Sequence, residues 1–161
     1  MKNMVDQVLR YIVKNYPIPE ELTKTRTTKL VYLVDWEMAK RKHRQLTDIE
    51  WKFDHFGPFV SDVYDAADED KELSIVKKQS AFGTTKYIVQ SKNDRERLEY
   101  PDLDRETQAI IDDVIDSVSH RKADFDSIYG RTSTQLALLK DQNSLLIASS
   151  LPPEILKNGP G

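Results

Sequence analysis

Several absences from the sequence exclude whole classes of function. The chain has no cysteine, so disulfide bonds, cysteine-ligated metal centres and thiol catalysis are excluded. Its five glycines form neither of the glycine-rich loops that cradle phosphates in nucleotide-binding proteins. No stretch approaches the roughly 18 to 20 uninterrupted apolar residues of a membrane-spanning helix. Because the first residues run into a charged amphipathic segment rather than a secretion signal, we expect a cytoplasmic protein with no membrane partner.

The residues that are present suit one folded domain. Of the 161 residues 39% are hydrophobic, which is enough for a core, and the net charge is −3. The charge is segregated, since residues 1–60 hold 11 basic and 8 acidic side chains whereas residues 61–130 hold 10 and 17. This acidic excess argues against nucleic acid as a partner of the whole surface. We expect residues 1–150 to form the domain and residues 151–161 to form a short, frayed tail.

Hydrophobic periodicity predicts the helices. Apolar side chains at three- and four-residue spacing mark one helix over residues 3–16 and another after Asp104, its expected N-cap. A longer helix, capped by Thr23 or Thr25, extends to about Arg44. The middle of this longer helix is apolar nearly all round, which predicts a central helix with neighbours on several sides. Shorter helices are expected over residues 60–68, 124–129 and 134–139.

Three strands are predicted beside the helices. Residues 49–56 alternate between apolar and polar side chains, as a half-buried strand does. Residues 73–77 and 85–89 are expected to form a hairpin, because the connection between them contains Gly83. The predicted fold class is therefore α+β: a helix-dominated single domain with a small antiparallel sheet, made of a β-hairpin plus one further strand.

One carboxylate is unusual for a plain scaffold. Asp35 lies in the middle of the most apolar helical stretch, where burial of a charge is costly unless the group is paired or hydrogen-bonded. We favour a structural hydrogen bond for it. The sequence offers four candidate partners for this carboxylate: Lys29, Arg26, Tyr32 and His55.

The turn at residues 55–60 is the second unusual place. Two phenylalanines flank the expected start of a helix there, where free backbone N–H groups point outward. Two interpretations stay open for this turn. It forms a docking surface or an anion site, or it packs one aromatic ring inward and caps the helix.

No pattern of catalytic or metal-binding residues occurs in the sequence. The three histidines, His43, His55 and His120, fall in separate predicted elements, and no two of them stand at helical spacing from each other. No nucleophile motif is present either. We therefore expect no enzymatic activity, no cofactor and no metal.

Three stretches follow one another in a pattern with a family resemblance. They are KLVYLVDW at residues 29–36, RQLT at residues 44–47, and an aromatic strand, a Gly-Pro turn and a Val-Tyr helix at residues 51–64. Together they resemble the Panacea domain of SocA-like antitoxins. The chain departs from that pattern at four positions, with His43 for glycine, Gln45 for proline, Phe56 for tyrosine and Phe59 for valine. The resemblance covers residues 24–66, and the hairpin and helix that follow have the family's order.

This resemblance implies an antitoxin of a bacterial or phage toxin–antitoxin system. Such a protein binds and neutralises its cognate toxin protein by direct stoichiometric contact. Some relatives deliver the toxin to a protease as adaptors, so a protease is a second implied partner. The residues expected to contact the partner are Lys29, Tyr32, Asp35, Trp36, Phe53, His55, Phe56, Gly57, Pro58, Phe59 and Tyr64.

The alternative function is a nucleic-acid-binding transcriptional regulator. The predicted helices and hairpin include the parts of a winged-helix domain, and the basic run at residues 40–44 would meet phosphates. We favour a solvated helix end as the interpretation of this run, because cations at the end of a helix complement the negative end of its dipole.

Overall fold

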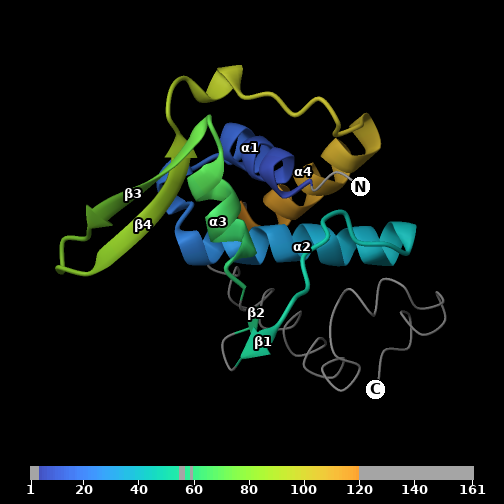
Figure 1. Ribbon diagram of the computed structural model, residues 1–161, viewed down its shortest axis with the longest axis horizontal. Helices are drawn as coiled ribbons and strands as arrows, with labels where there is room; N and C mark the ends of the chain where they lie inside the picture. Colours follow the sequence, from blue (N-terminus) through green and yellow to red (C-terminus); the bar gives the residue numbers. More distant parts are fainter. Residues whose placement is uncertain (1–3, 55–56, 59, 120–161) are drawn as a thin grey trace.

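The chain folds into helices packed around one central helix, with two small antiparallel sheets (Figure 1). The computed structural model describes residues 4–54, 57–58 and 60–119. The helices of this part are α1 Val5–Asn15, α2 Lys24–Lys42, α3 Asp62–Glu69 and α4 Arg105–Ser119, with short 3₁₀ turns at Pro19–Glu21 and Arg95–Arg97. The strands are β1 Phe53–Asp54, β2 Gly57–Pro58, β3 Leu73–Gln79 and β4 Thr85–Ser91. The predicted class, a helix-dominated α+β domain, is confirmed.

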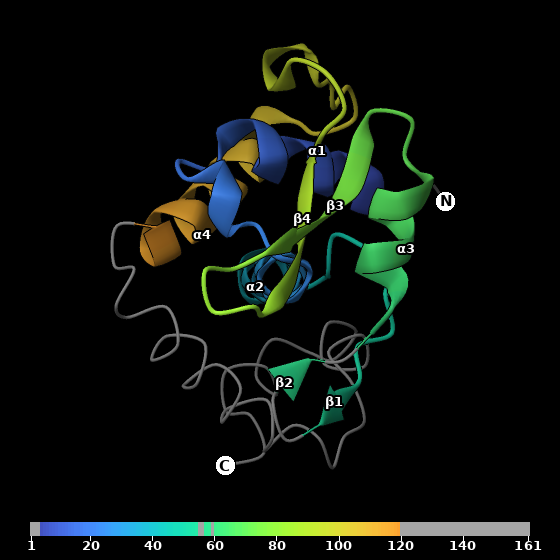
Figure 2. The ribbon, with the colours of Figure 1, turned by 90° about the vertical axis from the view of Figure 1, so that its left-hand side faces the viewer.

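Helix α2 is the centre of the fold, as its apolar sequence predicts. Figure 2 looks along it and shows α1, α3, α4 and the β3–β4 hairpin around it. Thr23 is the N-cap, since its hydroxyl accepts a hydrogen bond from the Arg26 backbone N–H at 3.1 Å. His43 ends the helix in the left-handed conformation, with φ of 60°. Every side chain from Leu30 to Trp36 is buried.

Helices α1 and α4 each bury one apolar stripe against the same core. Asp104 caps α4 as predicted, because its carboxylate accepts a hydrogen bond from the Thr107 backbone N–H at 2.7 Å. The two helices are also joined directly: the Tyr11 hydroxyl donates to Asp112 at 2.7 Å. The helices predicted over residues 3–16 and after Asp104 are thus confirmed.

The β3–β4 hairpin has the predicted antiparallel pairing and is longer than predicted by two residues in each strand. Its register runs from Leu73 opposite Ser91 to Gln79 opposite Thr85, and Gly83 takes a positive φ of 80° in the turn. The other edge of β4 meets the chain before α2, where the Val89 N–H donates to the Leu22 carbonyl at 2.9 Å. At Val89, β4 therefore has a neighbour on both of its edges: β3 on one and Leu22 on the other.

The predicted strand over residues 49–56 is largely wrong. Of its described residues, 49–54, only Phe53–Asp54 is a strand, and it pairs with Gly57–Pro58 rather than with the hairpin. Before it, Ile49 bonds to Gln45 and Thr47 of its own segment, and the Trp51 indole bonds to Asp35 of α2. Pro58 consequently lies in β2, and α3 begins at Asp62 instead of residue 60. The predicted helices at 124–129 and 134–139 and the tail at 151–161 lie outside the described residues.

Candidate partner-binding surface

A buried carboxylate fixes the segment that follows α2. Asp35 has no exposed surface, and its carboxylate accepts hydrogen bonds from five donors in residues 45–51. One oxygen accepts the backbone N–H groups of Leu46 and Thr47 at 3.1 and 2.9 Å. The other accepts the Trp51 indole N–H at 2.9 Å, the Gln45 amide at 3.3 Å and the Thr47 hydroxyl. We call residues 45–51 the clamped segment.

The clamp agrees with the favoured structural interpretation of Asp35. The four donor residues of the clamped segment were not among the candidates, and one of the candidates, His55, lies outside the described residues. Burial raises the pKa of the Asp35 carboxyl to about 6, while the hydrogen bonds from Thr47, Trp51 and Leu46 act in the opposite direction. In the charged form of the group, the donors of the clamped segment replace the water that it has lost.

Aromatic rings continue this arrangement toward β1. The ring of Tyr32 meets those of Trp51 and Phe53 edge to face, with centroids 5.0 and 5.6 Å apart. Tyr32 and Trp36 are buried, as is Asp35. Direct contact of these three side chains with a partner, as predicted, does not fit their burial. Asp35 and Tyr32 contact the clamped segment from its buried side, Asp35 through hydrogen bonds and Tyr32 through the Trp51 ring.

The other predicted contact residues are spread around the same region. Lys29, Phe53 and Tyr64 are half-buried, and Gly57 and Pro58 form β2. Their contact with a partner stays a prediction. The remaining three predicted residues, His55, Phe56 and Phe59, lie outside the described residues.

An acidic hollow lies between the clamped segment and the start of α3. Along the clamped segment, Thr47, Ile49 and Trp51 are buried, while Asp48 and Glu50 between them are exposed. This alternation turns the acidic side chains outward. The hollow has a volume of about 540 Å³ and is lined by Asp48, Glu50, Lys52, Val60, Ser61 and Asp62. Three carboxylates against one ammonium suit a basic segment of a partner.

A lysine and two tyrosines connect the hollow's side of α3 to the hairpin. The Lys24 ammonium lies 4.4 Å from the ring centroid of Tyr64 on α3 and 5.6 Å from that of Tyr87 on β4. This cluster fixes the hairpin relative to α3. Sequence reasoning selected Tyr64 but missed Lys24 and Tyr87, because three separate elements bring them together.

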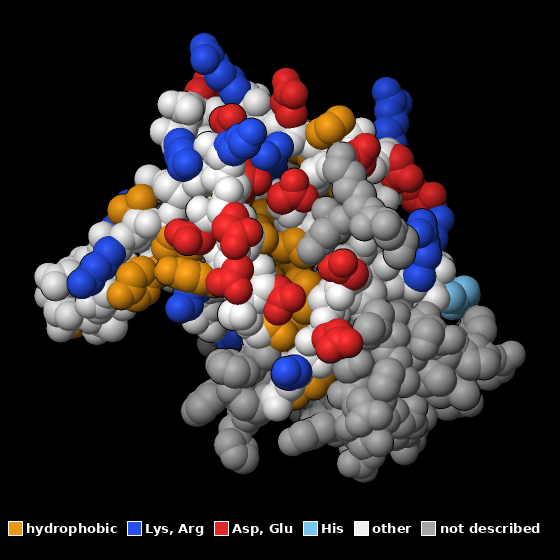
Figure 3. Space-filling view, in the orientation of Figure 1, with side chains coloured by type: hydrophobic (Ala, Val, Ile, Leu, Met, Phe, Trp, Pro, Cys, Tyr) orange, Lys and Arg blue, Asp and Glu red, His pale blue; other side chains and the backbone are white. Residues whose placement is uncertain are grey.

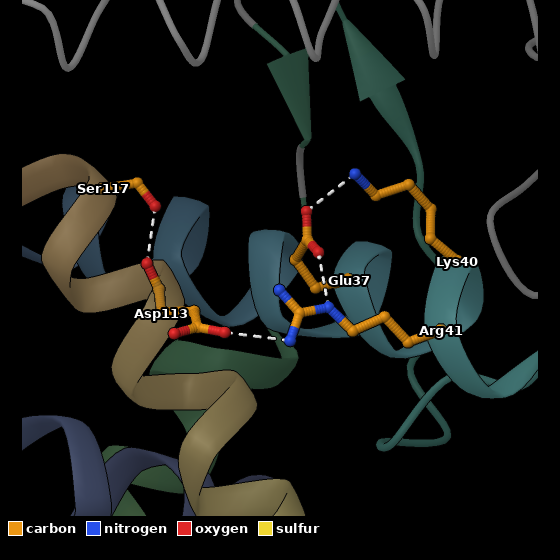
Figure 4. Close-up of polar contacts among 5 residues, drawn as sticks. All are labelled: Glu37, Lys40, Arg41, Asp113 and Ser117. Atoms are coloured by element: carbon orange, nitrogen blue, oxygen red, sulfur yellow. Dashed lines mark hydrogen bonds and ion pairs between the residues drawn. The ribbon is translucent and has the colours of Figure 1, made fainter.

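The basic run at the end of α2 is neutralised by acidic neighbours (Figure 4). Lys40 and Arg41 pair with Glu37 at 2.8 and 3.2 Å, and Arg41 also reaches Asp113 of α4 at 2.9 Å. A further pair joins the same helical turn to α4: Lys42 with Glu106. These pairs favour the interpretation of a solvated helix end and weaken the case for a phosphate-binding run.

Comparison with known proteins identifies the family. A protein-family model described as "Antitoxin SocA-like, Panacea domain" matches residues 28–125. The chain belongs to this family. Comparisons with curated proteins and with solved structures found no match. The matched range contains the clamped segment, the acidic hollow, the hairpin and α4, so these four features lie in the SocA-like domain itself.

Among the described residues, no three His, Asp or Glu side chains come together as a metal site would require. In the same part of the chain, no helix is both long and apolar enough to cross a bilayer.

Proposed function

We propose that this SocA-like protein is an antitoxin that binds its toxin directly and masks it in a stoichiometric complex. The observation that carries the proposal is the acidic hollow, which lies within the family-matched range and is built on a buried clamp. The toxin would be the product of a gene beside that of the antitoxin. We propose binding rather than catalysis as the mode of action.

The clamp gives the surface a fixed shape before any partner arrives. Burial of a charged group costs several kcal/mol, and the donors of the clamped segment offset that cost only while the segment keeps this conformation. The backbone that carries Asp48 and Glu50 is therefore held in one conformation in the free protein. A preorganised surface loses less conformational entropy on binding, which supports tight complex formation.

The acidic hollow also sets the kind of toxin surface that we expect. Its three carboxylates favour a patch of lysine or arginine side chains. A basic patch is what a toxin needs if it acts on nucleic acid or on phosphorylated substrates. An antitoxin that covers such a patch would block the toxin by occupying its substrate-binding surface.

The test is binding and rescue with the protein encoded by the neighbouring gene. We expect wild-type antitoxin to relieve its toxicity on co-expression and to form a stable complex with it. The double variant Asp48→Lys/Glu50→Lys, which reverses the charge of the hollow, should weaken the complex at least about 30-fold. The matched control is Glu96→Lys/Glu99→Lys, two exposed glutamates away from the hollow, with a change below about 3-fold.

Other outcomes would contradict the proposal. A wild-type protein that neither binds the neighbouring gene product nor relieves its toxicity would disprove the antitoxin function. Recovery of nucleic acid alone, lost at high salt, would support the transcriptional regulator instead. If the toxin is bound and its lifetime falls only when a protease is present, the protein acts as an adaptor rather than as a mask.

A further inference from the structure

The outer half of the β3–β4 hairpin, residues 77–87, projects from the body of the protein (Figure 1). We call these residues the arm. All of them are exposed except the half-buried Ser80, and Phe82 at the tip is 96% exposed. The arm carries three lysines, Lys77, Lys78 and Lys86, and no acidic residue, in a chain whose net charge is negative.

Packing explains the root of the hairpin but not the arm. At the root, Leu73, Ile88 and Val89 are buried. In the arm, Lys78 lies directly opposite Lys86, and like charges in that position destabilise a pair of strands. The ring of Phe82 gains almost nothing from burial. Residues that lower the stability of the fold and gain no packing contacts are expected where they serve binding.

The turn that carries Phe82 is nevertheless well defined. The Ser80 hydroxyl accepts hydrogen bonds from the backbone N–H groups of Phe82 and Thr84 at 3.3 and 3.0 Å. The Ser80 N–H also donates to the Thr84 carbonyl at 2.7 Å, and Gly83 supplies the positive φ. Phe82 therefore lies on a turn with defined hydrogen bonds. The cluster of Lys24, Tyr64 and Tyr87 connects the inner end of the arm to α3.

We infer that the arm is a second binding element for the same toxin, which meets it with an acidic patch around an apolar pocket. This inference rests on the proposed function. The lysines would face the acidic patch, and Phe82 would enter the pocket as an aromatic anchor. Together with the acidic hollow at the start of α3, the arm gives the protein two surfaces of opposite charge for one partner.

A protein fits the arm better than a nucleic acid does. Lys77 shares one face of the arm with Tyr87, whereas Lys78 and Lys86 share the other, so the lysines form no single track for phosphates. Acidic side chains gather over α3 beside the arm (Figure 3) and would repel a phosphate backbone. A protein surface with neighbouring acidic and basic patches matches both regions at once.

The test measures affinity for the neighbouring gene product with variants of the full chain. Lys78→Glu/Lys86→Glu should weaken the complex at least about 10-fold, chiefly through slower association, and the effect should shrink at high salt. Phe82→Ala should weaken it about 10-fold through faster dissociation. The matched control is Lys71→Glu/Lys92→Glu, a pair of exposed lysines next to the hairpin root, with a change below about 3-fold. Circular dichroism checks that each variant is folded.

The outcomes separate this inference from the proposed function. If the wild type does not bind the toxin, the proposed function fails and the inference fails with it. If the wild type binds and all arm variants bind equally well, the inference alone is wrong. If the arm variants instead lose affinity for a mixed-sequence DNA duplex while toxin affinity is unchanged, the arm is a nucleic-acid element and the inference is overturned.

Discussion

The two proposed contact segments, the clamped segment and the arm, are held in opposite ways. The clamped segment, residues 45–51, is bonded to a buried carboxylate and packs buried side chains beneath its exposed ones. The arm, residues 77–87, is held by its own turn and by its root, and its side chains are exposed. The same short segment therefore serves both stability and the proposed partner contact in the first case. In the arm, the residues proposed to contact the partner do not serve stability. Substitutions in the two segments should differ accordingly.

The largest effect should come from removal of the clamp itself. Asp35→Ala leaves the donors of the clamped segment without their acceptor, and we expect it to lower the free energy of unfolding by about 3–5 kcal/mol. Urea denaturation measures this change. Asp48→Ala, an exposed carboxylate on the same segment, is the control and should change stability by less than about 0.5 kcal/mol. Equal stability of the two variants would show that Asp35 does not hold the segment.

The titration of Asp35 gives the next largest effect. Its folded-state pKa of about 6 lies above its ordinary value of 3.8, so the folded protein binds more protons between these pH values. The resulting stability is complete below pH 3.8 and is lost as the pH rises through 6, by about 3 kcal/mol in total. Asp35→Asn does not titrate, so the wild-type advantage over it should shrink by this amount from about pH 4 to about pH 7. An advantage that grows with pH would contradict the raised pKa.

A single donor of the clamp should have a smaller effect. Thr47→Val keeps the shape of the side chain but removes the hydroxyl that donates to Asp35, and we expect a loss of about 1.5–3 kcal/mol. The corresponding change in the arm, Thr85→Val, affects an exposed side chain and should alter stability by less than about 0.5 kcal/mol. Thermal or urea unfolding of both variants compares the two segments directly. Similar losses in both would remove the distinction.

The smallest effects belong to the arm. Phe82→Ala should change the free energy of unfolding by less than about 0.5 kcal/mol, because the ring is exposed. Lys86→Thr removes the like-charge pair with Lys78 and should stabilise the protein by a few tenths of a kcal/mol. Urea denaturation of both variants tests this. A clear loss of stability in either would show that the arm serves the fold after all.

Most of the fold follows from local sequence patterns. The helices were predictable because apolar residues recur at helical spacing and because Thr23 and Asp104 are effective caps. The hairpin was predictable from two apolar runs around Gly83. In each of these cases a few neighbouring residues contain the whole signal.

The site depended on contacts that sequence spacing does not show. The alternation of Ile49 and Trp51 resembled a strand, but it arises because the segment bonds to Asp35 of α2, and two of the five donors are backbone N–H groups. Such donors have no sequence signature. The exposure of Phe82 was missed for a related reason: sequence does not say which phenylalanine lies in the core and which projects into solvent.

Hydrogen–deuterium exchange of this SocA-like protein, alone and mixed with the product of the neighbouring gene, shows directly whether the hollow and the arm bind the proposed toxin. We expect new protection in two places, around the acidic hollow at residues 48–62 and along the arm at residues 77–87. Protection confined to other surfaces, such as the exposed face of α4, with both of these segments unchanged in the complex, would contradict this expectation.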